Sequence, residues 1–254
     1  MAGKLARTAA LVTGASSGIG EATALALAGE GASVAIAARR KDKLDDLAKR
    51  IESAGGTALV IECDVTDEAQ ARHAVERTVA ELGRLDTLVN NAGVMLLGPA
   101  ASAPLEEWKR MVELNVLGLL YCAHAAIPHL VAAVESGDRK VSDMVSISSV
   151  AGRVARNGSG VYNATKFGVG AFSESLRQEL SGRHVRVSLV EPGAVATELA
   201  THVRPEVLQA LASRLSGVEI LQAEDIAEAV TFVVTRPRRV AVNEILIRPT
   251  EQES

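Results

Sequence analysis

The chain has 254 residues, of which 48% are hydrophobic and 23% charged, and its formal net charge is −4. This balance is ordinary for a globular protein and excludes a disordered chain. The mild acidity excludes the basic surface that nucleic acids or anionic membranes would need, so neither partner is expected. Because aromatic residues make up only 2%, the core must consist of Ala, Val, Leu and Ile, which suits helices packed on a parallel sheet.

Short apolar runs alternate with amphipathic segments along the whole chain. In order, the pattern predicts strand Thr8–Val12, helix Glu21–Glu30, strand Ser33–Ala37, helix Lys41–Ala54, strand Ala58–Glu62, helix Asp67–Leu82, strand Thr87–Val89, helices around Glu106–Val134, strand Asp143–Ser148, a helix around Asn163–Gly182, strand Arg186–Val190, a helix from near Ala223 and strand Glu244–Ile247. Such alternation implies right-handed crossovers and a doubly wound parallel α/β sheet of about seven strands with helices on both faces. Residues 1–254 are therefore expected to form a single Rossmann-type domain.

Two features bear on the compartment. The two cysteines, Cys63 and Cys122, stand in apolar segments and are expected to be buried and reduced. No long apolar region precedes the first strand, so no signal peptide and a cytoplasmic location are expected. The stretch Val116–Val134 is long enough to span a bilayer, but it contains Pro128 and two histidines. A buried or subunit-facing helix is the better interpretation.

A glycine-rich turn follows the first predicted strand directly. Gly14, Gly18 and Gly20 are spaced Gly-x-x-x-Gly-x-Gly, which differs from the commonest dinucleotide fingerprint. Glycines let the backbone approach a pyrophosphate, and the N-terminus of the following helix offers free N–H groups to the anion. Such turns join many strands and helices, but the strand before it and the βαβ pattern beyond it favour a nucleotide site.

The end of the second strand indicates which nucleotide binds. The segment Ala35–Arg40 ends in Arg39 and Arg40 and contains no acid that could bind a ribose 2′-hydroxyl. A guanidinium binds a 2′-phosphate in a forked geometry, and charged hydrogen bonds of about 1.5–3 kcal/mol would favour NADP(H) by about ten- to a hundredfold. The alternative is a surface arginine pair that caps the next helix.

A tyrosine and a lysine four residues apart suggest acid–base chemistry. Tyr162 and Lys166 lie on one face of a predicted helix. A phenol has a reference pKa near 10, and an adjacent ammonium lowers that pKa toward the working range. Taken alone, a pair at this spacing is most often exposed on a helix; together with the glycine turn it favours a catalytic pair.

Five segments in order carry a family resemblance. They are Thr13–Gly20, Asn90-Asn91-Ala92-Gly93, Ile147-Ser148-Ser149, Tyr162-Asn163-Ala164-Thr165-Lys166 and Pro192–Thr197. Over essentially its full length the chain resembles the short-chain dehydrogenase/reductase family. Met95–Pro99 and Glu244–Thr250 resemble a narrower group, which includes clavulanate dehydrogenase and the NADP-dependent 3-hydroxy acid and serine dehydrogenases.

The resemblance implies an NADP(H)-dependent oxidoreductase (EC 1.1.1.-), such as a carbonyl reductase, that moves a hydride between nicotinamide and a carbonyl or alcohol carbon of a small substrate. Tyr162 would be the proton donor or acceptor, and Lys166 would also hold the nicotinamide ribose. Ser149, with Ser148 the weaker candidate, would polarise the substrate oxygen. Asn115 would anchor a water beside the lysine.

The resemblance also implies the cofactor contacts. They are Gly14, Ser16, Ser17, Gly18, Ile19 and Gly20 in the turn, Arg39 and Arg40 after the second strand, Asp64 and Val65 at the adenine, Asn91, Ala92 and Gly93 at the ribose and nicotinamide, Tyr162 and Lys166, and Pro192, Gly193, Val195 and Thr197 at the carboxamide. For Asp64, an N-terminal helix cap is an equally good interpretation.

Residues 194–218 are expected to form a mobile, mostly apolar lid over the substrate. If the substrate carries a carboxylate, Arg153, Arg156 and Arg204 are unranked candidates to bind it. No Cys/His/Asp cluster has zinc spacing, so no metal is expected. By resemblance, the apolar helices around 106–134 and 163–182 would pair in a homodimer or homotetramer.

Two other functions remain open from sequence alone. One is a catalytically silent protein that senses NADP, although such proteins typically lose the tyrosine or the lysine. The other is an epimerase or dehydratase that shares the Tyr/Lys pair, although those chains are usually longer and space their glycines differently.

Overall fold

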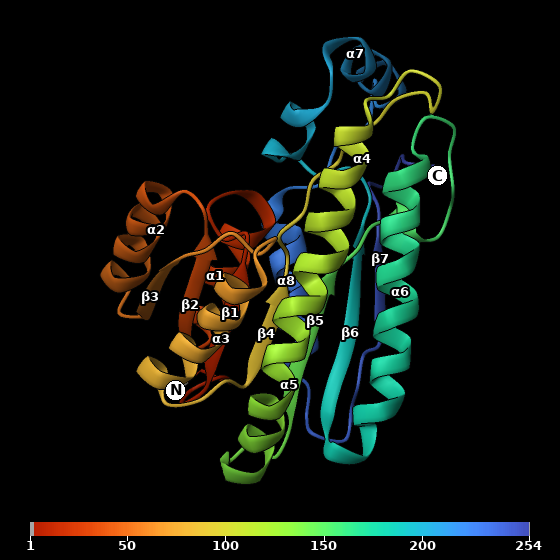
Figure 1. The fold of residues 1–254 in the computed structure, drawn as a ribbon. Helices are drawn as coiled ribbons and strands as arrows, with labels where there is room; N and C mark the ends of the chain where they lie inside the picture. The colour runs from red at the N-terminus through yellow and green to blue at the C-terminus, as the bar shows by residue number, and fades with distance from the viewer. Residues whose placement is uncertain (1–2, 254) are drawn as a thin grey trace.

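The computed structural model describes residues 3–253, apart from the side chains of residues 206, 210–212 and 214. Seven parallel strands form one sheet in the order β3-β2-β1-β4-β5-β6-β7 (Figure 1). The strands are β1 (Ala9–Thr13), β2 (Ser33–Ala38), β3 (Thr57–Glu62), β4 (Thr87–Asn90), β5 (Ser142–Ile147), β6 (Val185–Pro192) and β7 (Glu244–Ile247). The predicted doubly wound parallel sheet is confirmed.

Helices cover both faces of this sheet. The α-helices are α1 (Gly18–Gly29), α2 (Lys41–Ser53), α3 (Glu68–Leu82), α4 (Leu105–Val112), α5 (Leu119–Ser136), α6 (Gly160–Leu180), α7 (Pro205–Arg214) and α8 (Ala223–Val234). Shorter helical segments are the π-helical η1 (Glu113–Gly118) and the 3₁₀ turns η2 (Val150–Gly152), η3 (Ser181–Arg183) and η4 (Glu198–His202). Helices α1, α2 and α8 pack on one face, and α3, α5 and α6 on the other.

The alternation of side chains along the strands divides the core into two layers. In β2, Val34 and Ile36 face α1 and α2, whereas Ala35 and Ala37 face α3 and α5. Both layers are aliphatic and nearly free of solvent. A strand buried on both faces appears in sequence as an uninterrupted apolar run, which explains why these strands could be recognised from composition.

The apolar helix that raised the question of a membrane span belongs to this core. By length and composition the stretch Leu105–Ser136 passes as a candidate span, with a mean hydropathy of 1.7. In the structure α5 lies against α3, β4 and β5, and Cys122, Ala126 and Leu130 are buried between them. This packing supports the interpretation of a core helix. Cys63 and Cys122 are both free and buried, and burial raises their thiol pKa values to about 11 and about 12.

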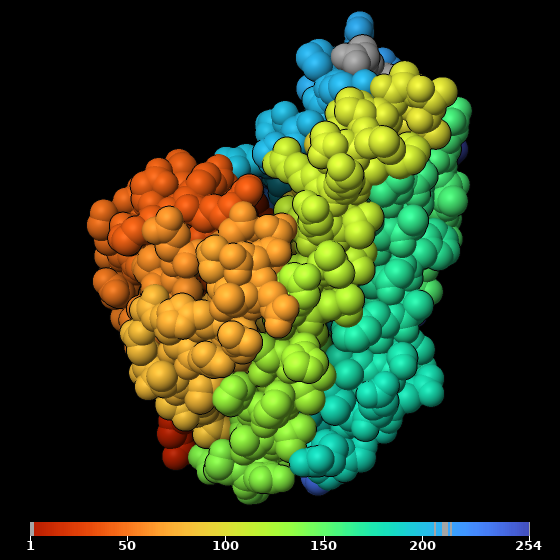
Figure 2. Space-filling model, in the orientation of Figure 1, coloured from red at the N-terminus to blue at the C-terminus, as the bar shows by residue number. Residues whose placement is uncertain are grey.

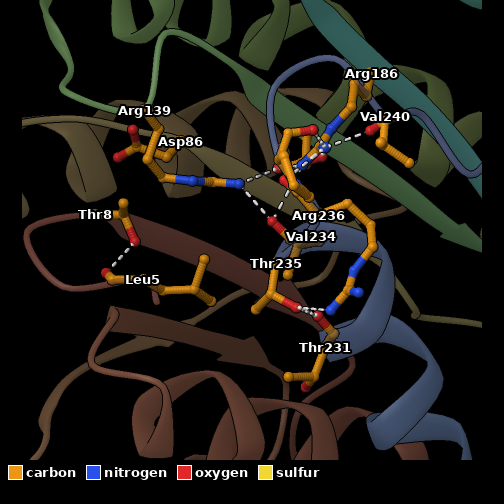
Figure 3. Close-up of polar contacts among 12 residues, drawn as sticks. Leu5, Thr8, Asp86, Arg139, Arg186, Thr231, Val234, Thr235, Arg236 and Val240 are labelled. Atoms are coloured by element: carbon orange, nitrogen blue, oxygen red, sulfur yellow. Dashed lines mark hydrogen bonds and ion pairs between the residues drawn. The ribbon is translucent and has the colours of Figure 1, made fainter. Parts of the chain in front are cut away.

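A buried ion network holds together the amino ends of β5 and β6, away from the glycine turn. Arg186 donates from Nε and Nη2 to the two carboxylate oxygens of Asp143, over 2.7 and 3.0 Å. Arg139 reaches the same carboxylate at 3.2 Å and also binds the carbonyl oxygen of Val234 at the end of α8. Arg186 further donates to the carbonyl oxygen of Val240 over 2.7 Å (Figure 3). Burial raises the pKa of Asp143, and the two guanidinium groups oppose that shift.

This network makes Arg186 a strong determinant of stability. Breaking a buried ion pair by removing one partner typically costs about 3–5 kcal/mol, and removal of Arg186 leaves the buried Asp143 with Arg139 as its remaining cationic partner. We therefore expect Arg186→Met to lower the free energy of unfolding in urea by about that amount. Arg183→Met, which removes an exposed arginine of the adjacent turn, is the matched control and should change the free energy little. Equal losses in the two variants would contradict this role of Arg186.

Candidate active site

The carboxyl ends of the parallel strands deliver many of the predicted site residues to one edge of the sheet. β1 leads into the glycine turn, β4 into Asn91, β5 into Ser148 and Ser149, and β6 into Gly193. β1 and β4 are neighbours at the point where the order of strands reverses, which is where open α/β sheets bind ligands. In the space-filling view a hollow lies between the orange N-terminal part of the chain and the yellow part, with light-blue residues of the segment around residue 200 above it (Figure 2).

The glycine turn has a conformation and a closeness of packing that only glycine allows. Gly14 has a φ of +65°, and a β-carbon there would lie 2.8 Å from the Cα of Ala92. At Gly20 a β-carbon would lie 2.4 Å from the carbonyl oxygen of Gly14. The side-chain amide of Asn91 donates to the carbonyl oxygens of Thr13 and Gly14 over 2.9 and 3.1 Å. These contacts fix the turn at the N-terminus of α1, and this cradle of backbone N–H groups fits the pyrophosphate of a dinucleotide.

A guanidinium group lies directly on this turn. Arg40 donates to the hydroxyl of Ser16 from Nε and Nη2, over 3.2 and 3.0 Å, and to the hydroxyl of Ser17 over 2.8 Å. Arg40 is the N-cap residue of α2, and its backbone carbonyl oxygen accepts from the N–H of Leu44, but its side chain makes no capping hydrogen bond. The alternative of a capping arginine therefore holds for the backbone of Arg40 and not for its guanidinium. Arg39 lies 4.0 Å from a carboxylate oxygen of Asp64.

The adenine end of the predicted site requires one correction. Asp67, not Asp64, caps α3, because its carboxylate accepts a hydrogen bond from the backbone N–H of Gln70 over 3.0 Å. This bond also holds the pKa of Asp67 below its usual range. Asp64 instead accepts from the backbone N–H and the hydroxyl of Thr66, over 3.0 and 2.8 Å. Val65 is buried against Gly118. The helix-cap interpretation of Asp64 is therefore wrong, and its adenine contact stays a prediction.

Tyr162 and Lys166 lie in the first turns of α6, which begins three residues earlier than the sequence pattern suggested. The two residues are 6% and 7% exposed, so both polar groups are buried. The ammonium of Lys166 donates to the carbonyl oxygen of Ile147 at the end of β5 over 2.8 Å and lies 5.9 Å from the centroid of the Tyr162 ring. Tyr162 shares a hydrogen bond with Ser149.

Burial dominates the acidity of this pair in the free protein. It raises the pKa of Tyr162 to about 12, against the opposing effect of the Ser149 hydrogen bond. It lowers the pKa of Lys166 to about 8. The expected lowering of the phenol pKa by the ammonium is therefore wrong for the free protein, because desolvation of the buried phenol outweighs the neighbouring charge. In this structure the phenol is therefore protonated at neutral pH.

The two serines after β5 have different environments. The hydroxyl of Ser148 points toward the backbone of α6, with 3.4 Å to the carbonyl oxygen of Lys166. Ser149 caps η2, because its hydroxyl accepts from the backbone N–H of Ala151 over 3.1 Å, and the same side chain forms a hydrogen bond with Tyr162. This arrangement favours Ser149, as predicted, as the serine next to the tyrosine.

Asn115 lies in the π-helical segment η1, a distortion that is frequent at functional sites. Its side-chain oxygen accepts from the backbone N–H of Val94 over 2.8 Å, and its amide donates to the carbonyl oxygen of Val94 over 2.9 Å. The side-chain oxygen and the Lys166 ammonium both border Gly93. The Asn115 side chain thus fixes the loop after β4, and its predicted contact with a water stays a prediction.

The loop after β6 reaches the glycine turn at Thr197. The backbone N–H of Gly193 donates to the carbonyl oxygen of Ile247 over 2.7 Å, and Val195 forms a β-bridge with Leu221. Thr197 caps η4, and its methyl carbon lies 3.1 Å from where a β-carbon on Gly18 would be. Thr197 therefore lies beside the glycine turn, whereas Pro192 and Gly193 are held against β7 and Val195 against Leu221. The contacts of all four residues with the carboxamide stay predictions.

Two of the three arginines suggested for a substrate carboxylate, Arg153 and Arg204, already pair with acids of the chain itself. Arg153 donates to the buried carboxylate of Glu191 over 2.8–2.9 Å and also pairs with Glu244. Arg204 lies 3.3 Å from a carboxylate oxygen of Glu107. The backbone N–H of Arg156 donates to Asn163 over 3.2 Å. The sequence did not reveal these acids as partners, because they are distant along the chain. Across residues 3–253, no group of three or more His, Cys, Asp and Glu side chains could hold a metal ion.

The fold and this edge of the sheet together define a nucleotide-dependent oxidoreductase of the Rossmann class. Residues 8–208 match the sequence model of the family described as short chain dehydrogenase, and the chain belongs to that family. A nicotinamide nucleotide is the cofactor of this class, and the glycine cradle described above fits it.

Three similar proteins illustrate the range of the family. Glycine betaine reductase of Emericella nidulans is 40% identical over 250 residues, which are 98% of this chain but only 19% of that protein. The closed form of serine dehydrogenase complexed with NADP+ has a TM-score of 0.87 and 33% identity, and covers 97% of each chain. A 3-ketoacyl-(acyl-carrier-protein) reductase of Brucella melitensis complexed with NADH has a TM-score of 0.85 and 30% identity, and covers 96% of this chain and 98% of that one.

The buried lysine makes stability depend on pH. A shift of the Lys166 pKa from 10.5 in the unfolded chain to about 8 in the folded protein corresponds to about 3 kcal/mol. This cost is fully present below pH 8 and disappears as the pH rises toward 10.5, because only the unfolded chain then still binds the proton. In Lys166→Met the cost is absent, but the carbonyl of Ile147 loses its partner, which costs about 1–2 kcal/mol.

We therefore expect Lys166→Met to be more stable than the natural protein by about 1–2 kcal/mol at pH 7 and less stable at pH 10.5. Urea unfolding at the two pH values measures both differences. Lys109→Met, which removes an exposed lysine of α4, should show no such reversal of sign. A difference for Lys166→Met that stays constant with pH would contradict the lowered pKa.

Proposed function

We propose that the protein transfers a hydride between NADP(H) and a carbonyl carbon, or the corresponding primary or secondary alcohol carbon, of a small molecule. The observation that carries this proposal is the hydrogen-bonded pair of Ser149 and Tyr162 with Lys166 one turn further on, at the same sheet edge as the glycine turn and Arg40. The bound cofactor supplies or accepts the hydride at its nicotinamide ring.

The residues of the chain then have distinct tasks in carbonyl reduction. The hydroxyls of Ser149 and Tyr162 hold the substrate oxygen, and Tyr162 donates its proton to that oxygen as negative charge develops there. The raised pKa of Tyr162, about 12, keeps the phenol protonated at neutral pH, which is the form that reduction requires. Alcohol oxidation requires the phenolate and would need the charge of Lys166 and of the oxidised cofactor to stabilise it.

Lys166 also links the tyrosine to the cofactor and to solvent. With a pKa of about 8, it is mostly an ammonium at neutral pH but gives up a proton readily, which suits a relay that reprotonates Tyr162. Its position beside Gly93 and Asn115 places it at the end of β4, where the family resemblance puts the nicotinamide ribose. Asn115 is a positioning residue of this relay.

The preference for NADP(H) is proposed on the chemistry of this chain, because similar structures hold either cofactor. The serine dehydrogenase structure contains NADP+ and the Brucella reductase structure contains NADH. Here β2 ends without an acid, and Arg40 with the hydroxyls of Ser16 and Ser17 forms a cluster of donors beside the glycine turn. Such a cluster fits a 2′-phosphate.

The substrate is proposed to be an uncharged aldehyde or ketone. Next to Tyr162, the residues Val94, Leu96 and Met111 form an apolar cluster, whereas Arg153 and Arg204 are engaged by Glu191 and Glu107. A free 3-hydroxy acid would have to compete with these carboxylates. The narrower resemblance to clavulanate and 3-hydroxy acid dehydrogenases thus stays a prediction, and an aldehyde fits the site better than an acid.

We also propose a cytoplasmic homodimer or homotetramer. Exposed apolar side chains gather on α4, η1 and α6: Leu105, Val112, Leu117 and Phe167. The tyrosine and the lysine are present and buried together, which argues against a silent sensor. The match of residues 8–208 to the short chain dehydrogenase model favours the oxidoreductase over an epimerase.

Replacing the phenol tests the catalytic role. Tyr162→Phe removes the proton donor without changing the shape of the side chain, so kcat should fall by about 10²–10⁴-fold while the Kd of NADPH changes by less than about twofold. NADPH oxidation against a panel of aldehydes and ketones measures turnover, and fluorescence titration measures binding. Tyr121→Phe on α5 is the control. Retained turnover in Tyr162→Phe would refute the assignment.

Replacing the arginine tests the cofactor preference. Arg40→Gln removes a charged donor at the proposed phosphate, so the Kd of NADPH should rise by about ten- to a hundredfold and that of NADH by much less. Arg39→Gln, which removes the neighbouring charge on the side of Asp64, should have the smaller effect. An equal loss of NADPH and NADH affinity in Arg40→Gln would contradict the 2′-phosphate site.

A further inference from the structure

The guanidinium that faces the proposed phosphate site already binds an anion of the chain. Nη2 of Arg40 lies 2.9 Å from a carboxylate oxygen of Glu198, besides its contacts of 3.0 and 2.8 Å with the hydroxyls of Ser16 and Ser17. This nitrogen carries two hydrogens, so three acceptors already share them. Hydrogen bonds from the Arg40 guanidinium and from the Ser17 hydroxyl hold the pKa of Glu198 below its usual range, so the carboxylate is ionised at neutral pH.

Glu198 belongs to the segment 198–204, which lies above the hollow seen in Figure 2 and is called the closing segment below; the hollow is called the cleft. Glu198 is the first residue of η4 and follows Thr197, which packs on Gly18 of the glycine turn. Six residues further on, Arg204 contacts Glu107 at 3.3 Å and the carbonyl oxygen of Leu97 at 3.4 Å, on the other side of the cleft. Residues 198–204 are thus held at both ends by an ion pair: Glu198 to the cofactor side and Arg204 to α4.

We propose that Glu198 is an internal competitor for the 2′-phosphate of the cofactor. This inference rests on the proposal that Arg40 binds that phosphate. A carboxylate and a phosphate on the same guanidinium nitrogen would lie within a few ångströms of each other, and two anions at that distance repel. Entry of the phosphorylated dinucleotide therefore displaces Glu198 from Arg40, and release of the dinucleotide lets Glu198 return.

The competition has two consequences for the enzyme. It weakens the binding of the 2′-phosphorylated cofactor while hardly affecting NADH, so Glu198 moderates the selectivity that Arg40 confers. It also couples the cofactor to the closing segment, because the displaced carboxylate is the first residue of η4. The Arg40–Glu198 pair is about half exposed, so salt screens it and its effect is modest.

Neutralising the carboxylate tests the competition. In Glu198→Gln the Kd values of NADPH and of adenosine 2′-phosphate, measured by calorimetry at low salt, should fall by about three- to tenfold. The Kd of NADH should change by less than about twofold. Unchanged or weaker binding of adenosine 2′-phosphate would overturn the proposal, and so would equal tightening of NADPH and NADH.

A matched variant separates charge competition from simple loosening of the segment. Glu107→Gln makes the same chemical change at the other ion pair, with Arg204, and should leave the affinity for adenosine 2′-phosphate unchanged. If Glu107→Gln tightened binding as much as Glu198→Gln, mobility of the segment rather than competition would explain the result, and the proposal would be overturned.

The arginine variant distinguishes failure of this inference from failure of the proposed function. If Arg40→Gln lowers the preference for NADPH but Glu198→Gln has no effect, only the competition is refuted. If Arg40→Gln leaves the preference unchanged, the proposed phosphate site fails and the inference fails with it. In the double variant Arg40→Gln/Glu198→Gln, the gain from neutralising Glu198 should disappear, because the competition requires the guanidinium.

Discussion

The hydrogen bond from the buried ammonium of Lys166 to the carbonyl oxygen of Ile147 is the contact on which the site depends. It joins the first turns of α6 to the end of β5, and this junction places Tyr162 beside Ser149. Burial of the ammonium opposes its charge, since desolvation lowers the pKa of Lys166 to about 8. A group held at a cost to stability suits a proton relay, because at neutral pH it both carries and releases a proton.

The fold could be predicted because the patterns that specify it lie within short segments of the sequence. Strands buried on both faces are uninterrupted apolar runs, and the glycines of the first turn are required by the backbone at Gly14 and by close packing at Gly20. The Tyr162–Lys166 pair was visible from its spacing on a helix. The ion pairs could not be predicted, because their partners are distant in sequence and come together only in the folded chain. The carboxylate partner of Arg40 lies on the closing segment, and Arg186 finds Asp143 on the next strand.

The mistaken predictions have the same physical origin. The sequence showed an ammonium near a phenol but not the degree of burial, so it gave the wrong direction for the pKa of Tyr162 in the free protein. Both Asp64 and Asp67 precede α3, and only the backbone geometry decides that Asp67 receives the N–H of Gln70. The π-helical turn that carries Asn115 could not be predicted from composition. In this turn the Asn115 side chain binds both the N–H and the carbonyl oxygen of Val94, a contact that exists only in the folded chain.

The arginines on the two sides of the cleft differ in the exposure of the carboxylates that bind them. On the cofactor side, Arg40 is about half exposed and held by one exposed carboxylate, so an incoming anion with two charges can take over that guanidinium. On the substrate side, Arg153 is held by the fully buried Glu191, and Arg204 by the partly buried Glu107. Displacing a buried carboxylate would leave it unpaired inside the protein, which is far more costly than displacing an exposed one. Under the proposed function, the same kind of ion pair would therefore admit a phosphate at one side and resist an acidic substrate at the other, and the protonated phenol of Tyr162 would act on a neutral carbonyl.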